Sequence, residues 1–542
     1  MSPGGVAASA VLLLIVARGA TAQEHDHARP SEQLGSVSFA TSCSAAAQPR
    51  FDRATALLHS FEFQRAIDAF GEALAADPSC AMAEWGIALS RWSNPFAVGL
   101  RSDVVVRQGR AAVERARTIG AKTDRERAYV DAVSRLYAEA ETTGQIARVQ
   151  AYRDAMANVA AAYPSDTEAA IFYALAIAAA ASPDDKTFAD QLKAGAILER
   201  LMALQPDHPG LAHYIIHSYD VPPLADRALD AARRYAKIAP SAPHALHMPS
   251  HTFTRLGYWQ ESIDANTAAA EVARREHAVA EELHTMDYRV YAYLQTGQDR
   301  NARRIVDALP EVSGRFDPDA VGSAAPGSAG VFALAAIPAR YALERGAWVE
   351  AARLEPHPSQ FPYTEALTYF ARAIGAARIG DAANVRRSVD ALRHIQRRLA
   401  QANERYWAEQ AEIQRRVASA WLAFSERRTS EALTQMRAAA VLEDTTEKAA
   451  VTPGSLAPAR ELLGEMLLEL HRPSEARQEF EATLEKEPNR FRTLSGAARA
   501  ASMAGDRSTA RRYYARLLEI CAHADTPGRS ELAAARAATA RP

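Results

Sequence analysis

Four histidines coincide when the sequence is shifted by 34 residues, because His213 and His217 then fall on His247 and His251. Within each pair the spacing is i, i+4, which places both imidazoles on one face of a helix with Cβ atoms about 5–6 Å apart. Two such rings can reach one ion, since a His–metal bond is about 2.0–2.1 Å long. We therefore predict that these four residues are metal ligands.

Other polar residues share the same helical stripe. After a six-residue insertion, Asp287 takes the repeat position of His213 and His247. Two more histidines lie three residues before that position in the second and third repeats, and an aspartate lies three residues after His217. Residues at such spacings lie along one face of a helix. We predict that they are additional ligands or acid–base groups: Asp220, Asp287, His244 and His284.

The predicted ligands are imidazoles without thiolates, a set that suits zinc, copper, iron or nickel better than calcium or magnesium. One four-histidine site and two nearby ions are both feasible. An open coordination position would activate water or a substrate oxygen, whereas a filled one would be structural or used for storage.

Two interpretations without a metal compete with this one. The histidines of a concave groove can bind a peptide or an anionic ligand directly. They can also be structural partners of the adjacent tyrosines Tyr214, Tyr219 and Tyr288. The doubled i, i+4 pair favours the metal, since a single pair is a much weaker signal.

The 34-residue period extends beyond the histidines. Small residues recur at Ala194, Ala228 and Ser262, and helix-ending prolines at Pro206 and Pro240. Such positions define helix-turn-helix units that stack on their neighbours. The chain resembles the tetratricopeptide repeat family, which implies an all-α, right-handed α-solenoid with a concave groove lined by the histidine stripe.

Four strings carry a closer likeness: LLHSFEFQRAIDAF, DPSCAMAEWGIALS, HALHMPSHTFTRLGYW and EPNRFRTLSGAARAA. They resemble a group of exported bacterial tetratricopeptide proteins, a likeness that implies no particular activity. Function must therefore be inferred from the residues.

The pattern predicts the following organisation: a signal peptide (1–22), an N-terminal arm (23–50), N-terminal repeats (51–98), irregular helical pairs (99–165), central repeats with the histidine site (166–310), a loop (311–330), further repeats (331–450), C-terminal repeats (451–525) and a tail (526–542). Residues 317–330 are rich in Gly, Ala, Ser and Pro. They form either a loop folded over the groove or a flexible connector, and composition favours the connector.

An apolar stretch from Val6 to Val16, followed by Ala20-Thr21-Ala22, predicts a signal peptide cleaved after Ala22 and a periplasmic or secreted protein. An oxidising compartment favours a Cys43–Cys80 disulfide over two free thiols. Cys521 is predicted to be a core residue.

The composition restricts the classes of binding partner that we expect. The formal net charge is −2 and aromatics are 7%, which gives no signal for nucleic acid. After the signal, no stretch reaches the roughly 20 apolar residues of a membrane span. A small molecule or peptide in the concave groove is expected, and a protein partner is left open.

These observations support two main hypotheses. The first is an exported solenoid with a transition metal on its concave face, acting as a metal-dependent hydrolase or oxidoreductase. The second is a non-catalytic periplasmic scaffold that binds a peptide or protein, and metal sequestration or delivery lies between the two.

Overall fold

The computed structural model describes Met1 and residues 32–97, 100–319 and 324–540. The predicted signal, residues 1–22, lies outside these residues except for Met1, as do His25 and His27 of the arm. Residues Gln33–Pro542 form one compact unit, to which the following description applies.

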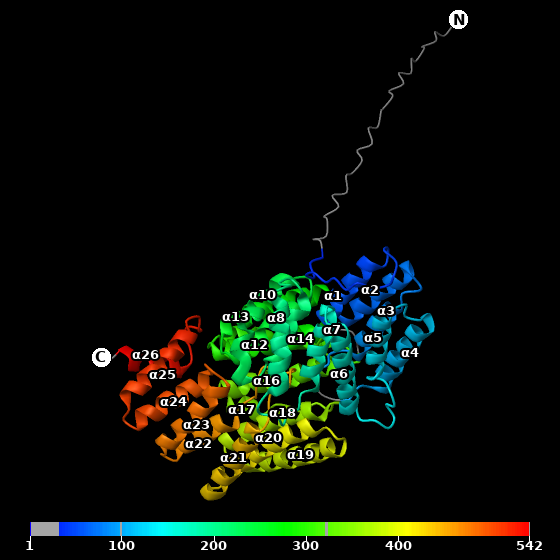
Figure 1. The fold of residues 1–542 in the computed structure, drawn as a ribbon. Coiled ribbons are helices and arrows are strands. Elements are labelled where there is room, and N and C mark those ends of the chain that lie inside the picture. The colour runs from blue at the N-terminus through cyan, green and yellow to red at the C-terminus, as the bar shows by residue number, and fades with distance from the viewer. Residues whose placement is uncertain (2–31, 98–99, 320–323, 541–542) are drawn as a thin grey trace. The chain divides into compact units, whose positions relative to one another are not determined.

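All regular elements of the described residues are helices, which confirms the predicted all-α class. Consecutive helices pack against each other along the chain, as expected for an α-solenoid of helix-turn-helix repeats (Figure 1). The N-terminal helices are α1 Gln48–His59, α2 Phe63–Ala76, α3 Ala81–Trp92, α4 Asp103–Ile119, α5 Asp124–Ser134, α6 Gln145–Ala162, α7 Thr167–Ala180 and α8 Ala189–Met202.

The central helices carry the histidine-rich region. Pro249 follows α11 after Met248 and begins α12, so the second histidine helix is divided into two short pieces. The central elements are α9 Pro209–Ser218, the 3-10 helix η1 Pro222–Ala228, α10 Leu229–Ile238, α11 Pro243–His247, α12 Pro249–Arg255, α13 Trp259–Arg275, α14 Val279–Gln295 and α15 Asp299–Gly314.

The C-terminal helices continue the series. They are α16 Gly327–Glu344, α17 Trp348–Ala352, α18 Pro362–Arg378, α19 Ala382–Gln401, α20 Arg405–Ser425, α21 Thr429–Asp444, α22 Ala459–Glu469, α23 Pro473–Lys486, α24 Phe491–Met503, α25 Arg507–Ile520 and α26 Ser530–Ala540.

The last repeats also contact the central helices. Trp259 Nε1 donates to the Asn489 carbonyl at 2.8 Å, and α14 packs against α24. The fully buried guanidinium of Arg490 donates to Tyr291 and to the carboxylates of Glu344 and Glu461. A buried arginine with this many acceptors fixes the position of each element that supplies one.

Small residues allow the helices of a repeat to approach closely. A Cβ added to Gly86 would lie 2.3 Å from the ring of Phe70, and one added to Gly496 would lie 2.4 Å from the ring of Phe480. In both cases the glycine follows the phenylalanine by 16 residues. The first and last repeats therefore use the same contact of an aromatic ring against a bare helix backbone.

The predicted disulfide is confirmed, since Cys43 and Cys80 are bonded and connect the segment before α1 to the start of α3. Cys521 is buried, and burial raises the pKa of its thiol to about 12. It is thus a protonated core residue at neutral pH.

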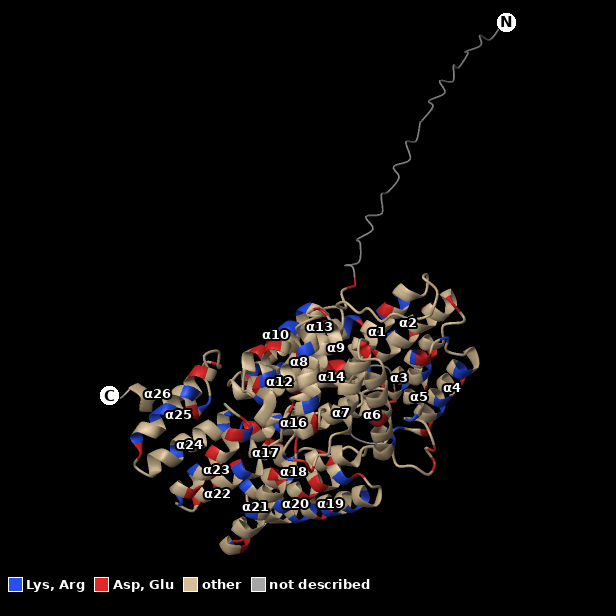
Figure 2. Cartoon of the chain, in the orientation of Figure 1, with Lys and Arg blue, Asp and Glu red and all other residues tan. Residues whose placement is uncertain are grey.

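Charges of both signs are mixed over the helices, for example on α19 to α23 (Figure 2). Within the described part of the chain, no helix has the length and hydropathy needed to cross a bilayer.

We predict that Gly86→Ala destabilises the fold by about 1–3 kcal/mol, because the new methyl group would overlap the Phe70 ring. Gly71→Ala is the matched control, since nothing lies within 4 Å of its added Cβ. We expect this control to be neutral or stabilising by up to about 1 kcal/mol. Urea unfolding of both variants measures the difference, and equal stabilities would contradict the packing argument.

Candidate metal centre

Six histidines from three neighbouring repeats meet inside the protein. Helix α9 supplies two of them, the divided helix α11–α12 three, and α14 one. They form two groups of three: His213, His217 and His244, and His247, His251 and His284. In each group, one ring nitrogen per residue lies within 4.8 Å of the other two. The sequence predicted the stripe, but the first group combines residues of α9 and α11, and the second combines residues of α11, α12 and α14.

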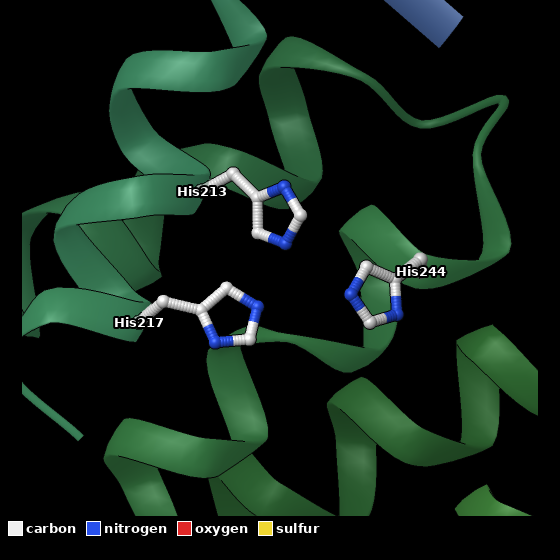
Figure 3. A group of neighbouring side chains, drawn as sticks. All are labelled: His213, His217 and His244. Carbon is white, nitrogen blue, oxygen red and sulfur yellow. The ribbon is translucent and has the colours of Figure 1, made fainter. Parts of the chain in front are cut away.

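The first trio is His213, His217 and His244. Figure 3 shows one nitrogen of each ring pointing toward a common centre. The Nε2 atoms of all three are buried and have no hydrogen-bond partner among the described residues. A buried ring nitrogen without a partner is costly. Three such atoms around one point are the arrangement expected of a metal site.

Partners on the outer side of the rings fix the tautomers of two members of this trio. His213 Nδ1 lies 2.6 Å from the carbonyl oxygen of His59, which can only accept, so Nδ1 carries the hydrogen. His244 Nδ1 lies 3.1 Å from Glu281 Oε1. Hydrogens on the outer nitrogens leave the lone pairs of both Nε2 atoms facing inward, as metal-binding histidines require.

Aromatic rings hold the imidazoles of this trio in place. Phe96 stacks on His217 with ring centroids 4.1 Å apart, and Tyr235 stacks on His213 at 5.2 Å. Gly210 has the repeat position of His244 and His284. A Cβ there would lie 2.5 Å from His59 Nδ1, so the glycine leaves room for the residue whose carbonyl orients His213.

In the second trio, too, hydrogen bonds to the outer ring nitrogens orient two of the imidazoles. His247 Nδ1 lies 2.7 Å from Asn266 Oδ1, and the amide nitrogen of Asn266 donates to the Ser262 carbonyl, so the oxygen must face the ring. His251 Nδ1 lies 2.9 Å from Asp220 Oδ2. Both outer nitrogens therefore donate, and both Nε2 atoms keep their lone pairs.

These two Nε2 atoms are only 3.1 Å apart. Two lone pairs facing each other at this distance repel unless a cation lies beside them. Two nitrogen ligands of a tetrahedral ion with bonds of about 2.0–2.1 Å would be about 3.3–3.4 Å apart. His284 completes the trio, with its ring centroid 4.5 Å from that of His247 and a buried Nδ1 that has no partner in the described part of the chain.

Tyr288 also contacts this trio. Its hydroxyl lies 3.2 Å from His251 Nε2 and 3.2 Å from the Thr452 carbonyl, and its single hydrogen can serve only one of them. Of the other two tyrosines, Tyr214 packs its ring 5.2 Å from that of His213 and places its hydroxyl 3.0 Å from His59 Nδ1. Tyr219 instead donates to Glu199.

Burial keeps these histidines uncharged. Desolvation, together with the neighbouring His251, lowers the pKa of His244 to about 3, and the same causes lower the pKa of His247 to about 3. Burial also lowers the pKa of the other four members from the usual range: His213, His217, His251 and His284. Neutral imidazole is the form that binds metal.

A small cavity lies between the two trios. It has a volume of about 20 Å³ and is lined by two histidines from each trio: His217, His244, His251 and His284. A cavity needs about 10–15 Å³ to hold one water molecule. The space is therefore large enough for water or an ion but too small for an organic substrate.

Segments of the chain itself cover this cavity. Residues from 94–97, 324–329 and 450–451 complete its lining. Asn94 Nδ2 donates to the Ala324 carbonyl at 3.3 Å, and the Ala325 amide donates to Glu281 Oε2 at 2.8 Å. The described part of the Gly/Ala/Ser/Pro-rich segment is thus folded over the histidines.

Asp220 orients His251 and does not itself belong to either trio. It also pairs with Arg255 at 2.9 Å and Lys448 at 3.0 Å. Burial alone would raise the pKa of Asp220, but Lys448, Arg255 and His251 together hold it well below the usual range. Its contacts are thus those of a residue that orients an imidazole, a role different from the ligand or acid–base group predicted from the sequence.

Asp287 is a member of neither histidine trio and forms a fully buried ion pair with Arg340, with Oδ1 3.0 Å from Nε. Burial raises its pKa, and Arg340 partly offsets that effect. Among the described residues, Asp287 therefore forms a structural ion pair with Arg340 and is not grouped with any of the histidines.

Sequence reasoning missed the groups that orient the rings: the His59 carbonyl, Asn266 and Glu281. Asn266 did carry a signal, because Leu198 and Ala232 share its repeat position and are apolar. A polar residue at a core position needs a partner. The spacing of His59 and Glu281 in the sequence did not mark either residue as a partner of the histidines.

A third buried cluster, His59, Glu168 and His208, differs from the trios. Glu168 accepts from both imidazoles, with its oxygens 3.0 Å from His59 Nε2 and 2.9 Å from His208 Nε2. The nitrogens that face Glu168 thus already have partners, and the cluster is a hydrogen-bonded network beside the first trio.

The fold and site together define an all-α repeat protein with a buried six-histidine cluster. No protein-family model and no curated protein matches the sequence. Among solved structures, the chain is similar to the human IFIT1 dimer with m7Gppp-AAAA, with 11% identity, TM-score 0.36 and coverage of 82% of this chain and 90% of that one.

Two further structures contain similar helical arrays. The APC/C hetero-tetramer Cut9-Hcn1 gives 13% identity and TM-score 0.33 over 91% of this chain and 89% of that one. The P58(IPK) TPR domain gives 14% identity and TM-score 0.21 over 69% and 99%.

We predict that the metal-free protein loses stability as the pH falls from 7 to 4. The unfolded chain protonates its histidines near pH 6.5, whereas His244 and His247 stay neutral in the folded protein down to about pH 3. Between these values the unfolded state binds more protons, so the free energy of unfolding decreases. Urea unfolding of chelator-treated protein at several pH values measures the slope.

The double variant His244→Gln, His247→Gln provides the control. It removes two of these groups, so the number of protons taken up on unfolding at pH 5 should fall by about two. An unchanged slope would show that these imidazoles are already protonated in the folded protein.

Proposed function

We propose that the protein binds transition metal ions through its two histidine trios. The observation that supports this most strongly is the convergence of three buried Nε2 atoms, from His213, His217 and His244, that have no other partner among the described residues. The outer N–H groups of two of these rings already have acceptors, so the inward lone pairs are fixed by the structure.

The ligand set suits zinc, copper, iron or nickel. Thiolate ligands are not available, because Cys43 and Cys80 form a disulfide and Cys521 lies in the core cluster of α24 to α26. Three protein ligands per ion leave a coordination position for water or a substrate. Such a centre supports hydrolytic or oxidative chemistry, with Asp220 and Glu281 as orienting groups.

The second candidate function is binding of a small organic molecule or peptide without metal. It is favoured by a larger cavity of about 120 Å³ on the other side of the 445–458 segment. One wall is aromatic, with the rings of Tyr363 and Trp407 stacked at 3.9 Å, and Arg255 and Lys448 line the cavity as well. At the histidine stripe itself the covering segments leave a peptide little room.

Export stays part of the proposal. The apolar stretch and cleavage motif of residues 1–22 would deliver the protein to the periplasm or outside the cell, where a Cys43–Cys80 disulfide persists.

We predict that the purified protein contains zinc, copper, iron or nickel, or takes one up after chelator treatment. Replacing His217 by Ala should lower metal occupancy at least tenfold at limiting free metal, because one of three ligands is lost from the first trio. His217 Nε2 has no partner among the described residues, so its removal leaves no orphaned hydrogen bond there.

His394→Ala is the control, since His394 is exposed on α19. Elemental analysis gives the metal content, and far-UV circular dichroism checks that helical content is unchanged. Failure of the wild-type protein to bind any of these four metals would refute the proposal and leave the organic-ligand function as the better candidate.

A further inference from the structure

The geometry points to a dinuclear copper centre in which each trio holds one ion and the cavity between them holds one dioxygen molecule. This inference rests on the proposed metal-binding function. It adds the number of ions, their identity and the class of small molecule that binds.

The two trios lie next to each other. Each supplies three neutral imidazoles, so neither needs to share a ligand with the other. The trios are adjacent: the ring centroids of His217 and His251 are 6.2 Å apart, and those of His244 and His247 are 5.9 Å apart. Two histidines of each trio face the same cavity. Ions in the two trios would therefore have their open positions on one shared space.

The size of the cavity limits what can bind between the trios. The cavity has about 20 Å³, enough for one water molecule or a diatomic molecule and too little for a carboxylic acid, sugar or peptide. The stacking of Phe96 on His217 and the Asn94 hydrogen bond to Ala324 close one side. The substrate that reaches both ions is thus limited to a molecule of one or two heavy atoms.

The charge of the site favours monovalent ions. All six ligands are imidazoles, which bind metal in the neutral form. The two carboxylates that hydrogen-bond to these rings, Asp220 and Glu281, do so at the outer nitrogens. Asp220 is further neutralised by Arg255 and Lys448. Two divalent ions would bring four positive charges into this buried site without an anionic ligand, and buried charge is costly. Two copper(I) ions bring only two positive charges.

Dioxygen is the diatomic ligand that can bind to two copper(I) ions without changing the net charge of the site. Each copper(I) gives one electron to the bound molecule, so two copper(II) ions face a dioxygen unit that carries two negative charges. No proton is consumed and no other reductant is required. The net charge of the site stays at two, which suits a site whose ligands are all uncharged imidazoles.

The test uses the chelator-treated full chain, titrated anaerobically with copper(I). We expect two copper ions per chain, uptake of one dioxygen for every two copper ions on exposure to oxygen, and loss of most of the copper(II) paramagnetic resonance signal, because the two unpaired electrons couple through the bridging ligand. His217→Ala and His284→Ala should each keep one copper, lose dioxygen uptake and, once oxidised, give the signal of an isolated copper(II). His394→Ala should behave as the wild type.

The outcomes separate this inference from the function on which it depends. No uptake of any transition metal overturns both. One copper per chain, two copper(II) ions with independent resonance signals, or selective loading with zinc in competition overturns the dinuclear copper centre and leaves metal binding intact. Since the wild-type stoichiometry decides the matter, variants that fail to fold do not obscure the result.

Discussion

The central repeats depend on one constraint: a buried imidazole has two nitrogens, and both must be provided for. In His213, His244, His247 and His251, a fixed acceptor takes the hydrogen of Nδ1. Each acceptor thereby decides that the other nitrogen presents a lone pair. Four such choices, made by a backbone carbonyl, two carboxylates and an amide, turn a polar cluster into a set of ligands aimed inward.

The solenoid supplies these acceptors because its repeats place unrelated segments at fixed positions around the stripe. His59 comes from α1 and reaches His213 because Gly210 leaves space beside it. Asn266 comes from α13, which packs behind α11 and α12. The hydrogen bonds that orient the rings therefore also connect repeats, and loss of one would affect both the site and its local packing.

The sequence predicted the fold and the histidines that come together better than the arrangement of these histidines within their cluster. The 34-residue period alone indicated which histidines share a stripe. It could not predict their grouping, because that depends on the offset between neighbouring helices and on the break at Pro249, which places His251 on its own short helix. Asp287 keeps the repeat position of His213 but pairs with Arg340, a residue distant in sequence whose approach no periodicity records.

The segments that cover the stripe link its chemistry to the rest of the molecule. The segment 445–458 lies between the histidine cavity and the larger cavity and contributes lining residues to both. Three of its residues also contact side chains from other parts of the protein. The Ala449 amide donates to Tyr406, Lys448 pairs with Asp220, and the Thr452 carbonyl lies beside Tyr288. Lys448 and Arg255 both line the larger cavity and pair with Asp220. Asp220 in turn orients His251. The electrostatics of the two cavities are thus coupled through one ion-pair network.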